Sequence, residues 1–191
     1  FICEEGLDAE FRHVGRFHGA HHPKAFDTLA REIDGRKSTF NPGAYLVRAD
    51  DMAGELGTSA YCGGAVFPKH CSLDPGKYHR GLLARCRAAG VQIVPRCRAT
   101  ELERLPVGFH LRTEKGNLNT GKVVLATNGY TGALSPWHQR RVIPIGSYVI
   151  ATEPVAPELM DRLFPTDRVL SDTRKLVYYF RPSPDRTRVL F

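Results

Sequence analysis

Three stretches of the sequence carry residue types that could bind or orient a small molecule. In the first, Lys122–Gly132, an apolar run ends at small and polar residues. These are Ala126, Thr127, Asn128 and Gly129. Small residues after a buried strand let the backbone approach a flat ring or a phosphate, and Gly129 tolerates a positive φ. An ordinary β-turn is the alternative interpretation.

The second stretch is Tyr178–Pro182, which combines aromatic residues with one arginine. Alternation along a strand places Tyr179 and Arg181 on one face and Tyr178 and Phe180 on the other. The planar guanidinium of arginine matches a carboxylate in bidentate fashion, so Arg181 is a candidate anion ligand. The alternative is an edge-strand arginine in water beside a stacking tyrosine.

The third group contains Tyr61, which precedes Gly63 and Gly64, and Tyr148 from the later apolar stretch Val142–Pro154. Phenolic hydroxyls can orient a polar substrate in an apolar pocket, although both tyrosines could equally be half-buried strand residues. The glycine pair permits close approach of a ligand or of another strand. Among the histidines, His70 is the candidate site residue, because it follows this glycine-rich segment.

Composition excludes several classes of protein. The formal net charge of the 191 residues is +7, but the arginines are scattered and interleaved with acids, which predicts a solvated basic surface and no nucleic-acid partner. Apolar runs stay well below the roughly 18 residues of a membrane span, so no membrane partner is expected. The five cysteines show no Cys-x-x-Cys spacing, which predicts reduced thiols in the cytoplasm and no metal site. Cys62 is interpreted as a small buried side chain.

Helices and strands alternate along the chain, which predicts a mixed α/β fold. Helices are predicted over residues 23–35, 52–56, 75–89, 132–140 and 157–163. Strands are predicted over residues 11–20, 61–68, 91–94, 99–102, 107–113, 118–126, 142–152, 176–181 and 188–191. Asp74 caps the third helix and Pro75 fits its first turn. Its predicted buried stripe consists of Leu82, Leu83, Cys86 and Ala89.

In their order and spacing, these segments resemble the FAD-dependent amine and amino-acid oxidase family, which includes D-amino-acid oxidase, glycine oxidase and sarcosine oxidase. The resemblance is strongest to the gamma-glutamylputrescine oxidase branch and covers nearly the whole chain. The segments that carry it are Tyr61–Gly64, Leu73–Leu82, Gly90–Ile93, Val123–Gly132, Pro144–Pro154 and Tyr178–Arg181.

The resemblance implies a two-domain flavoprotein in which residues 1–71 and 135–191 belong to a mixed-sheet substrate domain and residues 72–134 to the FAD-binding domain. The predicted cofactor contacts are Ala99, Thr100, Ala126, Thr127, Asn128, Gly129 and Gly64. The predicted substrate contacts are Arg181, Tyr148, Tyr179, Tyr61 and His70. The resemblance matches Arg181 to the arginine that holds the substrate carboxylate.

The sequence contains no Gly-x-Gly-x-x-Gly fingerprint, the loop with which this family holds the pyrophosphate of FAD. The chain also begins at Phe1 and ends within the apolar run Arg188–Phe191. We therefore expect a central fragment of a longer flavoprotein. FAD is expected in the full-length parent, whereas the fragment alone is expected to be flavin-free and inactive.

For the parent protein the resemblance implies oxidation of a C–N bond in a small amine or amino acid. Hydride passes to the flavin, the imine hydrolyses and oxygen reoxidises the cofactor. One alternative is a quinone-linked flavin dehydrogenase of the same fold, and another is a basic, non-enzymatic binding module. Apolar surface exposed in the fragment is expected to favour self-association.

Overall fold

The computed structural model describes residues 1–36 and 43–191, which form two compact units. The first unit contains Phe1–Cys86 together with Val149–Phe191, and the second contains Arg87–Tyr148. These boundaries differ from the predicted domain limits at 71/72 and 134/135, and the assignment of residues 72–134 to a FAD-binding domain stays a prediction.

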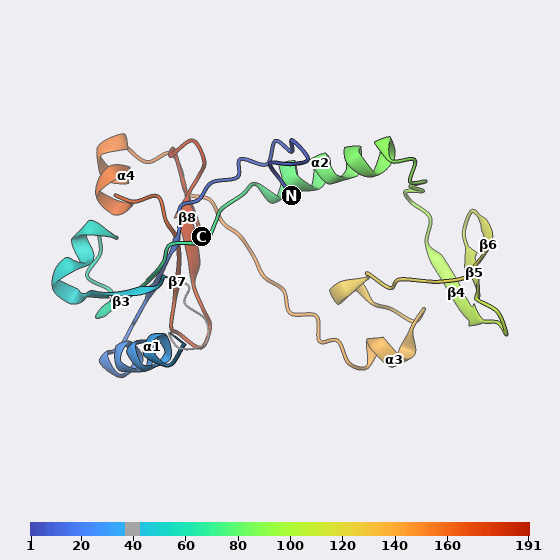
Figure 1. The fold of residues 1–191 in the computed structure, drawn as a ribbon, viewed down its shortest axis with the longest axis horizontal. Helices are drawn as coiled ribbons and strands as arrows, with labels where there is room; N and C mark the ends of the chain where they lie inside the picture. Colours follow the sequence, from blue (N-terminus) through green and yellow to red (C-terminus); the bar gives the residue numbers. More distant parts are fainter. Residues whose placement is uncertain (37–42) are drawn as a thin grey trace. The chain divides into compact units, whose positions relative to one another are not determined.

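A six-stranded mixed sheet organises the first unit (Figure 1). In spatial order its strands are β2 (Tyr45–Arg48), β3 (Gly63–Phe67), β1 (Arg16–Gly19), β7 (Val169–Asp172), β8 (Tyr179–Pro182) and β9 (Val189–Leu190). The central pair, β1 and β7, is parallel, while the other neighbours are antiparallel. The sheet therefore joins segments from the two ends of the chain.

One face of this sheet is covered by the main hydrophobic core. Phe17 of β1, Val66 of β3 and Leu170 of β7 point to this face. Met160 packs against them from helix α4 (Pro157–Leu163) and is 1% exposed. The 3₁₀ helix η1 (Ala49–Gly54) adds Met52 to the same cluster. The predicted helix over residues 157–163 is confirmed.

The opposite face is covered only in part, by helix α1 (Pro23–Arg36). Leu29 and Ile33 of α1 pack against Ala65 of β3, as the apolar spacing of this helix predicts. Because side chains alternate along a strand, Arg16 and His18 of β1 also belong to this face. The part of the face formed by β7, β8 and β9 carries the site discussed below.

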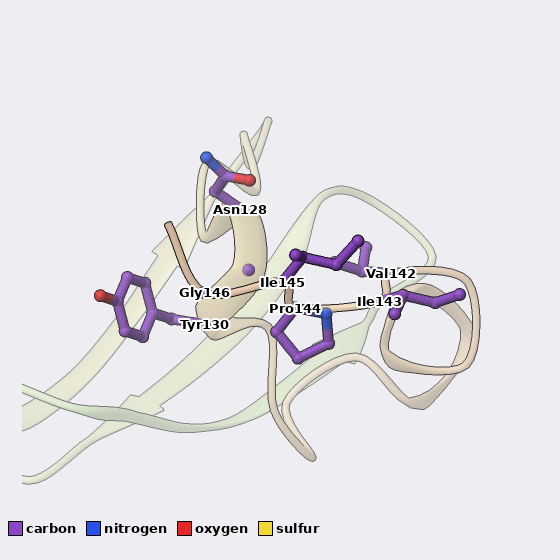
Figure 2. A pocket seen from close by; sticks show the side chains of 8 residues that line it. Asn128, Tyr130, Val142, Ile143, Pro144, Ile145 and Gly146 are labelled. Atoms are coloured by element: carbon purple, nitrogen blue, oxygen red, sulfur yellow. The ribbon is translucent and has the colours of Figure 1, made fainter. Parts of the chain in front are cut away.

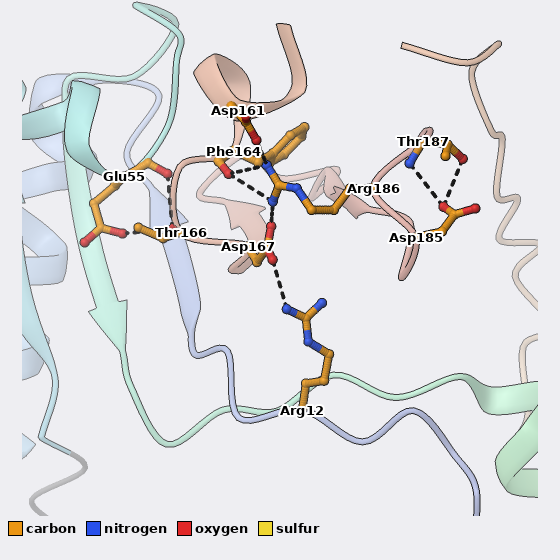
Figure 3. Close-up of polar contacts among 9 residues, drawn as sticks. All are labelled: Arg12, Glu55, Asp161, Phe164, Thr166, Asp167, Asp185, Arg186 and Thr187. Carbon is orange, nitrogen blue, oxygen red and sulfur yellow. Dashed lines mark hydrogen bonds and ion pairs between the residues drawn. The ribbon is translucent and has the colours of Figure 1, made fainter. Parts of the chain in front are cut away.

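Ion pairs tie the two chain segments of the first unit together (Figure 3). Asp167 accepts a hydrogen bond from Arg12 Nη2 at 2.9 Å and is also paired with Arg186. Arg186 Nη2 lies 2.6 Å from Asp161 Oδ1. The largely buried Arg168–Glu55 pair has a separation of 2.6 Å. These contacts hold the loop before β7 against segments from the beginning of the chain.

Helix α2 (Pro75–Ala88) begins as predicted, and Asp74 Oδ1 accepts a hydrogen bond from the Lys77 backbone N–H at 2.8 Å. The predicted buried stripe is wrong, because none of the helix residues is buried and Cys86 is exposed. The helix is contacted on one side by the N-terminal segment, where Leu7 lies beside Gly81. A helix covered on a single side over part of its length keeps its apolar residues half-exposed.

The second unit contains a three-stranded antiparallel sheet formed by β4 (Ala99–Arg104), β5 (Phe109–Thr113) and β6 (Gly116–Thr120). These strands confirm the predicted strand at 99–102 and the predicted hairpin. Short helices follow, the 3₁₀ helix η2 (Asn128–Tyr130) and α3 (Pro136–Gln139).

Three predicted strands are missing in whole or in part. No strand forms at residues 91–94, the strand predicted to run to Ala126 ends at Thr120, and most of residues 142–152 form no strand. Val124 is 89% exposed, so the expectation of a strand buried on both faces is wrong. A strand of that kind needs a neighbour on each side. Within the part of the chain that the structure describes, Ala151 forms a single bridge to Leu190, flanked by backbone hydrogen bonds of Ile150 to Phe191 and of Thr152 to Val189, and the rest of these runs joins no sheet.

No helix within residues 1–36 and 43–191 is long and apolar enough to cross a membrane. All five cysteines are free thiols, and Cys62 is exposed, so the prediction of a buried side chain there is wrong. Among the same residues, no group of three or more His, Cys, Asp or Glu side chains is placed to hold a metal ion.

Candidate functional site

A pocket of about 430 Å³ lies in the first unit on the partly covered face of the six-stranded sheet. Its polar side chains are Arg16 of β1, Tyr179 and Arg181 of β8, and Asp74 at the start of α2. The remaining lining is apolar, with side chains or backbone of Val149, Val169, Leu170, Phe180, Leu190 and Phe191 together with two prolines. The pocket is therefore an apolar hollow that contains two guanidinium groups.

Arg181 and Tyr179 lie together in this pocket, as the alternation of their strand predicts. Phe180 between them packs against the core on the opposite face, where its ring is 6.3 Å from that of Phe164. Arg181 is half-buried, and its Nη2 donates to the Leu73 carbonyl oxygen at 3.3 Å. This one bond holds the guanidinium and leaves other N–H groups for an anion.

The carboxylate of Asp74 is engaged in the fold although it lines the pocket. It accepts the Lys77 backbone N–H, and this hydrogen bond is the main reason why the pKa of Asp74 is lowered. The capping bond keeps this carboxylate ionised, but among the described residues it forms no ion pair with Arg16 or Arg181. Asp74 therefore leaves the two arginines of the pocket without a dedicated counter-ion.

Arg16 was not singled out in the sequence, where it is one arginine of a weakly alternating segment. In the structure its guanidinium carbon lies 4.7 Å from the centroid of the Phe67 ring. Its Nε is buried and has no hydrogen-bond partner among the described residues. Burial lowers the pKa of Arg16, opposed by the nearby Tyr179 hydroxyl. The alternation of β1 was the available signal, since it places Arg16 opposite the core face.

The charge of Arg16 also acts on two nearby histidines, although Asp172 and Glu32 act on His18 in the opposite direction. The pKa of His18 is lowered by burial and then by Arg16, and the pKa of His70 is lowered by the same two causes in the same order. His18 Nδ1 lies 2.7 Å from Ser171 Oγ. The His70 ring centroid lies 5.5 Å from that of Phe67. Both imidazoles are thus favoured in their neutral form.

Tyr61 and Gly64 serve the packing of the sheet. Tyr61 is buried, and its hydroxyl donates to Asp172 Oδ2 at 3.5 Å. Burial, followed by the charge of Asp172, raises the pKa of Tyr61. A Cβ at Gly64 would collide with the Phe17 ring and lie 2.6 Å from the His18 carbonyl oxygen. Neither residue lines the pocket, so their predicted contacts with substrate and cofactor stay predictions.

The second unit brings two of the predicted cofactor segments together. A pocket of about 350 Å³ is lined by Ala99 and Thr100 of β4 and by Thr127 from the turn after the apolar run. Thr100 Oγ1 donates to the Arg112 carbonyl at 3.3 Å, and Thr127 Oγ1 lies 2.7 Å from Thr131 Oγ1. Small side chains and hydroxyls around a pocket fit one ring system of a nucleotide.

A neighbouring pocket of about 530 Å³ is lined by Asn128, Gly129 and Val142–Gly146 (Figure 2). The positive φ of this turn is at Asn128 (46°), whereas Gly129, which would tolerate one, does not adopt it. The space beside Gly129 is open, since an added Cβ would meet no atom closer than Pro144 Cβ at 3.8 Å. Ala126 lines neither pocket, and Tyr148, which is 88% exposed, also belongs to this unit.

The residues present therefore fit part of FAD. Ala99, Thr100 and Thr127 can accommodate a ring through small side chains, and the turn at Asn128–Gly129 leaves backbone accessible. The sequence, however, contains no Gly-x-Gly pair, so it supplies no glycine-rich loop for the pyrophosphate. These residues would suit contacts with one portion of the cofactor, and the sequence lacks the glycine-rich loop of the family.

Comparison with known proteins shows which family the chain belongs to. A probable oxidoreductase, OrdL, of Haemophilus influenzae is 31% identical over 169 residues, which are 86% of this chain and 39% of the relative. The gamma-glutamylputrescine oxidoreductase of Escherichia coli K12 is 25% identical over 97% of this chain and 43% of its own length. Glycine oxidase from Geobacillus kaustophilus superimposes with a TM-score of 0.74 at 15% identity, over 97% of this chain and 48% of that structure.

The chain thus spans less than half the length of these relatives. The structural match shows a shared mixed α/β fold. A family model for FAD-dependent oxidoreductases of the D-amino-acid oxidase type matches residues 1–191, the whole of this chain. The chain therefore belongs to the FAD-dependent oxidoreductases of this family.

Proposed function

We propose that this chain is part of an enzyme that oxidises the C–N bond of a small amine or amino acid with FAD, and that Arg181 binds the carboxylate of the substrate. The observation that supports this role is the position of Arg181. It is half-buried on an open sheet face, in a largely apolar pocket, and among the described residues its one hydrogen bond is to a backbone carbonyl.

The chain's own residues would act by binding and orientation. Arg181 has N–H groups left after its bond to Leu73, and a carboxylate can accept two of them in parallel. Val169 and Leu190 exclude water around that ion pair, which strengthens it. Tyr179 borders the same pocket and can donate a hydrogen bond to a polar substrate group.

FAD, when bound, would supply the hydride acceptor for the carbon next to the substrate nitrogen. The imine would be hydrolysed to a carbonyl and ammonia or an amine, and oxygen would take up the two electrons as hydrogen peroxide. Ala99, Thr100 and Thr127 would contact a ring of the cofactor, and Asn128 and Gly129 would offer it backbone. The exposed side chains of Ile143 and Ile145 support the further proposal that the chain by itself self-associates.

The test uses the product of the complete gene, assayed with amino acids and with the corresponding amines that lack the carboxylate. We expect Arg181→Gln to raise the KM of the amino acids at least about tenfold, because a charged hydrogen-bond partner is lost, and to leave the KM of the amines unchanged. The control is Arg48→Gln, which removes the same charge from an exposed position on β2.

An unchanged KM for the amino acids in Arg181→Gln would contradict the carboxylate role. Oxygen consumption and reduction of a quinone-like dye, measured side by side, distinguish an oxidase from a quinone-linked dehydrogenase. Failure of every amine and amino acid to support either reaction would overturn the proposed function.

A further inference from the structure

Arg16 is a second cation in the pocket that contains Arg181, and it has no anionic partner. Among the described residues, its side chain forms no hydrogen bond and no ion pair, and its Nε is buried. A buried polar group without a partner costs free energy, and a charged group costs more. Stacking on Phe67 compensates for only part of this cost, because the ring accepts no conventional hydrogen bond.

The register of the sheet places Arg16 and Arg181 on the same face. Arg16 pairs with Val169 of β7, and Ser171 of β7 pairs with Tyr179 of β8. Arg181 is two residues beyond Tyr179, so it points to the same side as Tyr179. The two arginines therefore come from strands separated only by β7. With strands about 4.8 Å apart, their Cα atoms are separated by roughly 10 Å.

Two guanidinium groups and one carboxylate line the pocket, so its lining carries one net positive charge. Asp74 is the one carboxylate in the lining, and it is engaged as the cap of α2. His18 and His70 lie close enough to Arg16 to have their protonation disfavoured by it. One carboxylate bound to Arg181 would neutralise one guanidinium and leave Arg16 unpaired. A ligand with a second anionic group would neutralise both.

We propose that Arg16 binds a second anionic group of the ligand held by Arg181, so that this pocket selects dicarboxylic substrates. The inference rests on the proposed function, since it deepens the substrate class of the same pocket. The apolar residue between the two arginines, Val169, suits the methylene chain that joins two carboxylates.

Binding of inert probes to the 191-residue chain tests the proposed role of Arg16 without requiring turnover. The probes are glutarate and valerate, which have the same number of carbons but two carboxylates and one. Calorimetry measures their affinities, and the side-chain N–H signals of the arginines in NMR spectra report which guanidinium is contacted. We expect glutarate to bind at least about tenfold more tightly than valerate and to shift the Arg16 signal.

Arg16→Gln should lower the affinity for glutarate to that for valerate and leave valerate unaffected. Arg16→Lys, which keeps the charge without the planar fork, should give an intermediate affinity. Arg48→Gln is the charge-matched control and should retain the preference for glutarate. Thermal denaturation of each variant verifies that it is folded. If Arg16→Gln does not fold, the affinity of Arg16→Lys for glutarate and the NMR shift of the Arg16 signal show whether Arg16 binds the second carboxylate.

An equal affinity of the folded wild-type chain for the two probes, or no binding of glutarate, overturns the inference. So does an unchanged preference for glutarate in folded Arg16→Gln. The two proposals fail separately. If Arg181→Gln no longer binds valerate while Arg16→Gln still prefers glutarate over valerate, the carboxylate role of Arg181 is supported and the proposed role of Arg16 is contradicted. If Arg181→Gln keeps both affinities, the carboxylate role itself is contradicted.

Discussion

The environment of His18 links the pocket to the stability of the sheet. Burial and the charge of Arg16 hold the pKa of His18 below its ordinary value of 6.5. As the pH falls through 6.5, the unfolded chain takes up a proton before the folded chain does. The stability that neutral His18 contributes is therefore complete above pH 6.5 and is lost as the pH falls from 6.5 towards the folded-state pKa.

We predict that His18→Asn makes stability less dependent on pH. Asparagine stays neutral and can still form a hydrogen bond with Ser171, so it retains the contact without the titration. Thermal denaturation between about pH 7.5 and pH 5.5 should show a Tm that falls more steeply for the wild type than for the variant. Parallel slopes for the two proteins would contradict this account of His18.

At the scale of single residues, the sequence predicted the members of the pocket that lie on one strand. Alternation was sufficient to place Tyr179 and Arg181 together and Phe180 on the opposite side. Alternation along β1 places Arg16 opposite the core face but does not bring it beside Arg181, because β7 and β8 are far away in the chain and one sequence does not indicate which strands pair. Tyr61 was singled out for its hydroxyl, which the structure shows donating to Asp172.

At the scale of elements, β1 and β3 depend on a close approach at Gly64. A methyl group there would collide with Phe17 and with the backbone of His18. We predict that Gly64→Ala lowers the free energy of unfolding by about 1–3 kcal/mol, which is typical of overpacking in a core. Urea denaturation, followed by circular dichroism, measures this change.

A matched substitution at Gly35, in helix α1, should have the opposite effect. Among described atoms an alanine Cβ there meets nothing within 4 Å, and alanine favours a helix over glycine by up to about 1 kcal/mol. Gly35→Ala should therefore leave stability unchanged or raise it. Equal destabilisation by the two variants would show that the contact between Phe17 and Gly64 is not the cause.

The elements that the sequence predicted well have signals of their own. The Asp74–Pro75 pair starts α2, Pro157 starts α4, and the β5–β6 hairpin turns within a few residues. The apolar runs before Ala126 and after Val142 have no such local signal. Whether they become strands depends on pairing with other strands, and within the described part of the chain they gain at most one bridge. Pairing of this kind cannot be predicted from the run itself.

At the scale of the whole molecule, the chain has the fold of its family, while its sequence contains no glycine-rich phosphate loop. We predict that the purified 191-residue chain shows no visible flavin absorbance and no oxidase activity, because nothing in its sequence supplies the glycine-rich phosphate loop. The product of the complete gene, purified in the same way, should be yellow. Bound flavin in the 191-residue chain at a stoichiometric ratio would contradict the prediction.

The parallel pairing of β1 with β7 has a consequence for the order in which the protein is made. Within these 191 residues, strands β1, β2 and β3 leave the ribosome before the others, but β1 exposes an unpaired edge until β7 follows more than 100 residues later. In the meantime the β4–β6 sheet can form from contacts that are local in sequence. Within these 191 residues the first unit therefore completes its folding after the β4–β6 sheet, although three of its strands are synthesised before that sheet, and these early strands need protection from aggregation during translation.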